Sequence, residues 1–316
     1  MQSTWISCFN SKAWRCFLFY SMSASSVSFS AGKYFLALLF HSVDRSQFSN
    51  TSIFTILVDE INYLQKEGLK IQTREGSFHI YFALGLVLGD NLGLNSALGF
   101  TESFNATYFC RFCKMSKNDS HSCPVKRTDL LRTEQNYNND LLLNNMKETG
   151  VKENSVWNKV NYFHVTANAA VDKMHDFDEG VYKYGMSHIL YHYIYDIKNV
   201  SLNILNERLK GIDYASNNIS NRLPSLRKDE VRKKKLSFSA SEMSYFLLLF
   251  PFIVGEDVCH DDVWEYYLIL RKIHDLVNAK YLQEECAELL GVLIEEHHVK
   301  YCNLFMDNLK AKHHNT

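Results

Sequence analysis

The sequence predicts a predominantly helical α/β protein, and three observations support this fold class. The 316 residues include only three prolines and 13 glycines, which favours long uninterrupted elements, mainly helices. Residues 33–90 follow a strand, helix, strand pattern, and helical periodicity dominates from Asp261 to about Leu309. Hydrophobic residues make up 46% and charged residues 22% of the chain, which is ordinary for a globular protein with a substantial core.

The first predicted elements form a β–α–β unit. Lys33–Val43 is a short apolar run suited to a buried strand. Ser77–Leu88 is rich in aromatic and branched residues and predicts a second strand, with Asp90 at its tip. Between them, Ser52–Lys66 has apolar residues at helical spacing on one face: Ile53, Ile56, Leu57, Ile61 and Leu64. This order indicates a parallel sheet with a crossover helix.

The rest of the chain is predicted to be mostly helical. Ala167–Ile197 reads as a long helical stretch, and Ser216–Lys235 reads as a polar linker. The next predicted helix, Glu242–Val254, follows two serines that could cap its first turn, Ser239 and Ser241. No internal repeat is visible.

Charge and cysteine content limit the class of partner and compartment. A net charge of -1 gives no global basic field, so any contact with DNA must come from local clusters. Arg227–Lys235 is one such basic run, although a solvated linker is at least as good an interpretation. No segment reaches 18 apolar residues, which argues against a membrane partner. The eight unevenly spaced cysteines favour a reducing, intracellular location, nuclear or cytoplasmic, over a disulfide framework.

A cluster of four residues in a polar, Asn-rich region predicts a metal site. Cys110 and Cys113 lie on one tight turn, and His121 and Cys123 follow within the same short window. Two thiolates, a nitrogen and a third thiolate suit tetrahedral Zn²⁺, and four protein ligands indicate a structural role. The alternative is a loop with scattered buried cysteines, for which this polar surround is unfavourable.

Acidic residues provide two weaker candidates. Asp90, beyond the end of a buried strand, is placed where a sheet presents a carboxylate to Mg²⁺, although a turn aspartate is the simpler interpretation. In Val171–Val181, Asp172, His175, Asp176 and Glu179 would share one face of an α-helix. A solvated face with a structural histidine is the simpler reading of that segment.

Taken in order, these segments resemble the transposases of cut-and-paste DNA elements of the CACTA (En/Spm) type. The most specific parts are LGLVLGDNLGLNSALGF with the cysteines of CRFCK, and VDKMHDFDEGVY, and the resemblance covers roughly residues 33–312. It implies an RNase H-like sheet with an acidic triad that binds two Mg²⁺ ions. It also implies cleavage of DNA at the element ends and transfer of the 3′ ends to target DNA, with DNA as the partner and a homo-oligomer as an option.

The resemblance assigns roles to four residues. Asp90 corresponds to the second catalytic aspartate, after the fourth strand of such a fold. Asp172 and His175 match the D-x2-H signature expected downstream of that aspartate. The third acid is expected on a later helix, where we choose Glu242, with Glu256 as the second choice.

The chain departs from the family at its N-terminus. The first catalytic aspartate is expected on the first strand, but residues 1–32 contain no acidic residue. We therefore expect a truncated copy whose sheet lacks its first two strands, and no strand-transfer activity. The expected organisation is a non-homologous or poorly ordered segment over 1–32 and a partial RNase H-like core over 33–100. A zinc-stapled insertion over 101–235 and a helical region over 236–316 follow. The alternative function is a non-catalytic, zinc-dependent module that binds DNA or protein.

Overall fold

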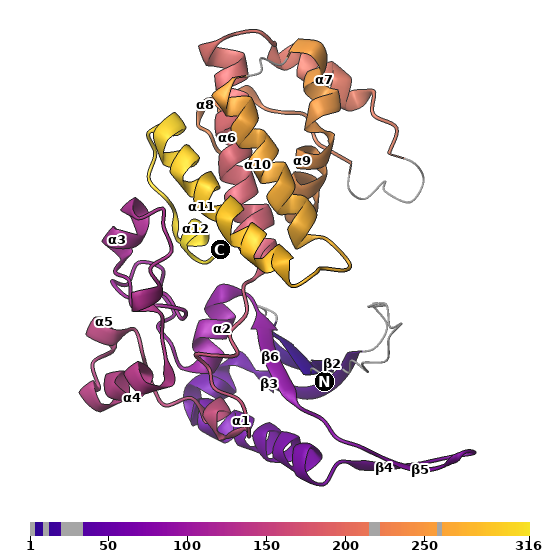
Figure 1. The fold of residues 1–316 in the computed structure, drawn as a ribbon, viewed down its shortest axis with the longest axis vertical. Coiled ribbons are helices and arrows are strands. Elements are labelled where there is room, and N and C mark those ends of the chain that lie inside the picture. Colours follow the sequence, from indigo (N-terminus) through magenta and orange to yellow (C-terminus); the bar gives the residue numbers. More distant parts are fainter. Residues whose placement is uncertain (1–3, 9–12, 20–33, 215–221, 258–260) are drawn as a thin grey trace. The chain divides into compact units, whose positions relative to one another are not determined.

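A computed structural model of the chain describes residues 4–8, 13–19, 34–214, 222–257 and 261–316 (Figure 1). The chain divides into two compact units. Unit 1 comprises Met1–Lys117 and Arg127–Asp172, and unit 2 comprises Asn118–Lys126 and Lys173–Thr316. The second boundary, after Asp172, falls inside the segment predicted as the insertion. Helices predominate and strands are few, as expected for a mostly helical α/β protein.

Four strands of unit 1 pair two by two, as β1 with β6 and β2 with β3. β1 (Thr4–Cys8) pairs in parallel with β6 (Leu84–Gly89), and β2 (Ala13–Phe19) pairs antiparallel with β3 (Tyr34–His41). β1 also contacts β2. The expectation that the first two strands are missing is therefore wrong. Residues 1–32 lack acids, but the segments TWISC and AWRCFLF are rich in the branched and aromatic residues that favour strands.

The helix α1 (Ser42–Lys66) connects the β3 edge of this arrangement to the later strands. The predicted helix over Ser52–Lys66 is present and ends where expected, but it begins ten residues earlier, and its buried face is rotated from the predicted one. Leu57 and Ile61 are buried as predicted, whereas Ile56 is 65% exposed, and Phe54 and Val58 complete the buried face. The helix is kinked at Ser49, where φ is 74°, so one helical period does not extend through its whole length.

Two of the predicted strands differ in detail from the structure. The single strand predicted over Ser77–Leu88 is two strands, because the chain first forms an exposed hairpin of β4 (Leu69–Thr73) and β5 (Gly76–Ile80). It then enters the sheet as β6. The predicted strand at Lys33–Val43 is present as β3, but Leu36 and Leu39 are more than half exposed, so it is not fully buried.

The remainder of unit 1 packs around β6 and α1. Its helices are α2 (Asn91–Leu98), η1 (Thr128–Leu130), α4 (Glu134–Leu143), α5 (Met146–Thr149) and η2 (Val156–Lys159). One hydrophobic core joins the helix, the sheet and the later loops through Phe54, Val87, Leu94, Phe100, Tyr137 and Trp157.

Unit 2 is built of helices. They are η3 (Lys173–Val181), α6 (Tyr182–Tyr191), η4 (His192–Asp196), α7 (Leu202–Lys210), α8 (Lys228–Arg232), α9 (Ala240–Val254), η6 (Gly255–Asp257), α10 (Asp262–Val277), α11 (Glu285–Phe305) and α12 (Ala311–His314). A short helix, α3 (Lys117–Ser122), carries the segment 118–126 that belongs to this unit. The helical stretch predicted over Ala167–Ile197 is present from Lys173 to Asp196, with π-helical turns before and after α6.

The centre of unit 2 is the contact of α6 with α9 and α10. Gly185 permits this approach, because a Cβ there would lie 2.7 Å from both Leu270 Cδ1 and Tyr266 Oη. The start of α9 is capped by Ser239, one of the two serines predicted for this role, whose Oγ accepts from Glu242 N. Among the described residues, none of the helices combines the length and apolar character needed to cross a membrane.

Candidate functional site

Asp90 lies at the tip of β6, as the sequence predicted. β6 ends at Gly89, and Asp90 is the N-cap of α2, where its Oδ1 accepts a hydrogen bond of 2.8 Å from Gly93 N. This bond explains why an acid is favourable at the turn, since an N-cap oxygen satisfies a free helical N–H group. A carboxylate has acceptor capacity beyond one such bond, so the cap does not use all of it.

Asp172 lies at the same edge of the sheet as Asp90. Ala169 bridges Val87 of β6 in parallel, and Asn168 Nδ2 donates to Gly85 O at 2.8 Å, which fixes this segment beside β6. Asp90 lies three residues after Val87, and Asp172 lies three residues after Ala169, the bridge partner of Val87. Because parallel segments advance together along a sheet, equal offsets bring the two carboxylates to the same carboxyl-terminal edge of unit 1.

The neighbour of β6 on its other side contributes no acid to this edge. The parallel register of β1 and β6 pairs Cys8 with Gly89, one residue before Asp90. Residues 1–32 contain neither aspartate nor glutamate. The carboxylate edge of unit 1 is therefore formed by Asp90 and Asp172 without an acid from β1.

The segment that carries His175 is not the α-helix that the sequence predicted. Lys173–Val181 is π-helical and starts after Asp172, so Asp172, His175, Asp176 and Glu179 do not follow α-helical spacing. The simpler reading as a solvated face is also wrong for Asp176, which is fully buried and accepts from Asn315 Nδ2 at 3.2 Å. Burial of this acid is tolerated because it has a hydrogen-bond partner.

Glu242, chosen as the third acid, takes part in the cap of α9 in unit 2. Its Oε2 accepts from Ser239 N at 2.7 Å, which completes a reciprocal capping box with the Ser239 hydroxyl. Glu256, the second choice, is exposed in η6 of the same unit. The capping role alone accounts for a glutamate at position 242.

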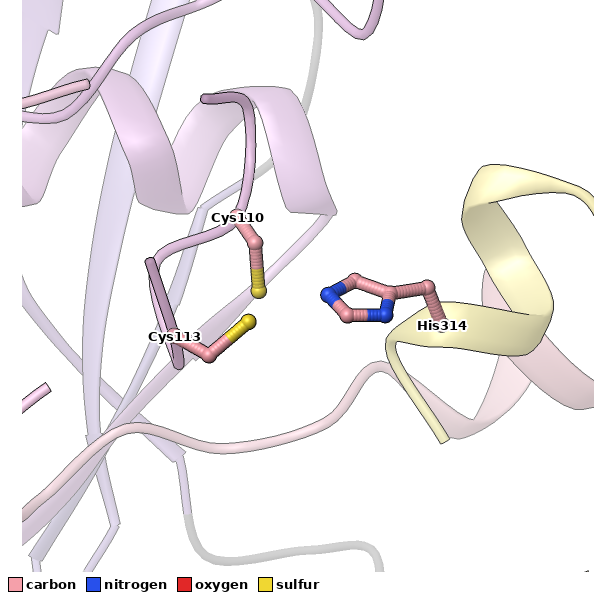
Figure 2. A group of neighbouring side chains, drawn as sticks. All are labelled: Cys110, Cys113 and His314. Carbon is pink, nitrogen blue, oxygen red and sulfur yellow. The ribbon is translucent and has the colours of Figure 1, made fainter. Parts of the chain in front are cut away.

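Cys110 and Cys113 form a thiol pair on one loop of unit 1, and their side chains point toward one another (Figure 2). Both are buried, and two backbone donors face the sulfur atoms: Phe112 N lies 3.3 Å from Cys110 Sγ, and Met115 N lies 3.4 Å from Cys113 Sγ. The pKa of the Cys113 thiol is raised well above its usual range by its hydrogen bond to Cys110, by burial and by repulsion between two thiolates. A bound cation would remove that repulsion.

A buried arginine supports the loop that carries the thiol pair. Arg132 Nε donates to Cys110 O at 3.1 Å, and its other nitrogens donate to Asp140 Oδ2 at 3.1 Å and Thr149 O at 2.7 Å. Its side chain is fully buried, and Lys114 Nζ also contacts Asp140, at 2.7 Å. Arg132 therefore fixes the backbone of the loop and places a positive charge close to the sulfur atoms.

The other candidate ligands belong to unit 2. His121 O accepts from Leu309 N at 3.0 Å, and the Cys123 thiol donates to Val125 O at 3.3 Å. Within unit 1, the thiols of Cys110 and Cys113 are two donors that suit a soft or borderline metal ion such as Zn²⁺.

The comparison with known families and curated proteins returned no match: no family model and no curated protein matches this chain. The carboxylate edge of unit 1 and the thiol pair are the two features of the structure that bear on function.

Proposed function

We propose that this chain is a transposase-derived protein with an RNase H-like unit 1, whose ancestral reaction is metal-dependent cleavage and transfer of DNA strands. The observation that carries the proposal is the position of Asp90 and Asp172 at one edge of the sheet. Phosphoryl transfer by two Mg²⁺ ions needs carboxylates supplied from neighbouring strand ends, because the two ions hold the attacking and leaving oxygens.

The order of the strands gives further support. Once the β4–β5 hairpin is set aside, β6 is the fourth strand along the chain, and Asp90 follows it directly. β1 runs parallel to β6 as its direct neighbour. An acid on the first strand, where the family resemblance expects one, would therefore lie beside Asp90.

The same register explains why we propose that the reaction is disabled. The described part of β1 ends at Cys8, the partner of Gly89, and no acid occurs in this region of the sequence. Two carboxylates without the third would bind Mg²⁺ weakly and leave one oxygen of the displacement without a metal partner. We propose that the protein keeps an affinity for DNA and has lost strand transfer.

Restoring an acid on β1 tests this proposal directly. The change Cys8→Asp is expected to create Mn²⁺- or Mg²⁺-dependent nicking of supercoiled plasmid DNA that the unsubstituted protein lacks, and to tighten Mn²⁺ binding by about tenfold or more. The physical reason is that a third carboxylate completes the set of oxygen ligands for hard cations. Nicking is measured on agarose gels, and Mn²⁺ affinity by the loss of the free-ion EPR signal.

Matched variants separate a site effect from a general effect of added charge. Cys8→Asn has the same shape without the charge and should remain inactive. Cys8→Asp combined with Asp90→Ala should lose both the nicking and the gained Mn²⁺ affinity. Unchanged Mn²⁺ binding in Cys8→Asp, or nicking that survives Asp90→Ala, would contradict the proposal.

We also propose that Cys110 and Cys113 hold a structural Zn²⁺ ion. The two backbone N–H groups that face the sulfur atoms favour their thiolate forms, and Arg132 adds positive charge. When bound, the ion would join the two cysteines and so stabilise the loop that carries them. His121 and Cys123, predicted from spacing, stay the candidates for the remaining positions.

Metal analysis of purified variants tests the zinc proposal. Cys110→Ser and Cys113→Ser should each lose about one equivalent of zinc, because serine is a poor ligand for this ion. Cys302→Ser, which changes a cysteine of α11, is the matched control and should keep the metal. Loss of zinc in Cys123→Ser and in His121→Gln would support the spacing-based prediction of the remaining ligands, and zinc retained in both variants would contradict it.

A second candidate function is a non-catalytic, zinc-dependent binding module. The absence of an acid from 1–32, together with the thiol pair, favours it. It predicts that chelation unfolds the region around residues 101–125 and that Asp90→Ala leaves DNA binding unchanged. Divalent-ion-dependent DNA binding that Asp90→Ala weakens would instead favour the transposase-derived site.

A further inference from the structure

Arg111 connects the thiol pair to the carboxylate edge within unit 1. It lies between Cys110 and Cys113 in the sequence, and only 2% of the residue is exposed. Its Nη1 donates to Asn91 Oδ1 at 2.8 Å and approaches Asn95 Oδ1 at 3.4 Å. Its Nη2 donates to Ala170 O at 2.6 Å.

The two ends of this guanidinium fork contact the segments that carry the two acids. Asn91 is the first residue of α2 and directly follows Asp90. Ala170 comes two residues before Asp172. A planar guanidinium with several donors in fixed directions holds such partners at a defined separation, which a flexible ammonium group does not do. Arg111 therefore sets the distance between the backbone segments of Asp90 and Asp172.

The loop over residues 110–115, which carries the thiol pair and is called the thiol loop below, holds the base of the Arg111 side chain. The bonds from Phe112 N and Met115 N to the two sulfur atoms fix the backbone on the C-terminal side of Arg111, and Arg132 holds Cys110 O on the other side. The Arg111 guanidinium also lies 4.3 Å above the centre of the Phe112 ring, which restricts its rotation. A change in the conformation of this loop would move the fork.

We propose that Arg111 is a positioning residue that couples metal binding at Cys110 and Cys113 to the geometry of Asp90 and Asp172. With metal on the two sulfurs the loop is fixed, the fork holds α2 and the segment 168–172 together, and the two carboxylates keep their separation. Without metal the loop loosens and the N-terminal turn of α2 opens more often. This inference rests on the proposed zinc site and carboxylate edge, and it adds a dependence of the second on the first.

Hydrogen exchange of the full-length protein tests the coupling without any DNA substrate. The readouts are the amides of Gly93 and Leu94, which bond Asp90 Oδ1 and Asp90 O, both at 2.8 Å. Removal of zinc by a chelator should speed their exchange by about tenfold or more, because these bonds open locally. In Arg111→Met the two amides should exchange fast even with zinc bound, and chelation should add little.

Two control variants keep the test decisive. Arg127→Met changes an arginine of unit 1 whose side chain is half exposed, and should behave as the unsubstituted protein. Arg111→Lys keeps the charge without the fork and should give exchange close to that of Arg111→Met. If Arg111→Met does not fold, Arg111→Lys and the chelation of the unsubstituted protein still decide the result.

The inference is overturned if chelation speeds exchange around residues 110–115 and leaves Gly93 and Leu94 unchanged. It is also overturned if Arg111→Lys retains the full response to zinc. Failure of the proposed function would look different, because Mn²⁺ binding in Cys8→Asp would then be absent while the zinc-dependent exchange persists.

Discussion

Acidification from about pH 7.5 to about pH 5 is expected to unfold unit 2 of this protein while its carboxylates are still mostly ionised. The cause is a group of buried histidines on α11 and α12: His297, His298 and His313. Their rings lie together, with centroids 5.3 to 5.6 Å apart. A charged imidazolium in this group would lack water, and a second one would also be repelled by the first.

The pKa values of all three side chains are lowered, with burial as the first cause. The pKa of His297 falls well below its usual value through burial and the neighbouring His298 and His313. Burial also lowers the pKa of His298, to about 4. The pKa of His313 is well below the usual value through burial, His298 and Lys310, and Asp307 opposes this only in part.

The direction of the effect follows from proton uptake. Unfolded histidine has a pKa of about 6.5, so below that pH the unfolded chain binds protons that the folded unit excludes. The free energy of unfolding therefore falls by about 1.4 kcal/mol per pH unit for each such histidine, between about pH 6.5 and the folded pKa. The three histidines act in the same direction, so the stability of unit 2 falls steeply once the pH drops below about 6.5.

Urea unfolding at a series of pH values, followed by circular dichroism, measures this loss. His297→Gln should reduce the slope of stability against pH between about pH 6 and 5 by about one proton. His79→Gln, at an exposed position of the β5 strand in unit 1, is the matched control and should leave the slope unchanged. A stability of unit 2 that is constant from pH 7.5 to 5 would contradict the prediction.

Loss of Asp140 is expected to destabilise unit 1 by about 3–5 kcal/mol, because it leaves a buried arginine without its counter-charge. Asp140 is 1% exposed and bonds both Arg132 and Lys114. Burial lowers the pKa of Arg132, and the neighbouring Asp140 carboxylate opposes this and so favours the charged guanidinium. In Asp140→Ala the guanidinium keeps its bonds to Cys110 O and Thr149 O but loses the carboxylate.

Denaturant unfolding of a short series checks this expectation. Asp129→Ala removes an exposed acid paired with Arg127 and should change stability by less than about 1 kcal/mol. Arg132→Met combined with Asp140→Leu removes both charges and should recover most of the loss in Asp140→Ala. Because Arg132 holds the thiol loop, Asp140→Ala should also weaken zinc binding. Equal effects of Asp140→Ala and Asp129→Ala would show that the buried pair contributes little.

Local features of this protein were predictable from the sequence. The acid at the tip of β6 and the serine cap of α9 were found by pattern, because each depends on residues a few positions apart. The cysteine turn was found for the same reason. The predicted α-helical face at 172–179 failed, because α-helical spacing was assumed where the chain is π-helical and Asp176 is buried against Asn315.

The sequence by itself determined the end of β6, the serine cap of α9 and the candidate ligands Cys110 and Cys113, because these depend on short-range bonding. Only the tertiary structure decided that β1 is the parallel neighbour of β6, that Asp172 returns to the edge beside Asp90, and that Arg111 joins Asn91 to Ala170. Each of these contacts brings together residues far apart in the chain. Their pairing is selected by burial and hydrogen bonding in the folded unit, which no local pattern records.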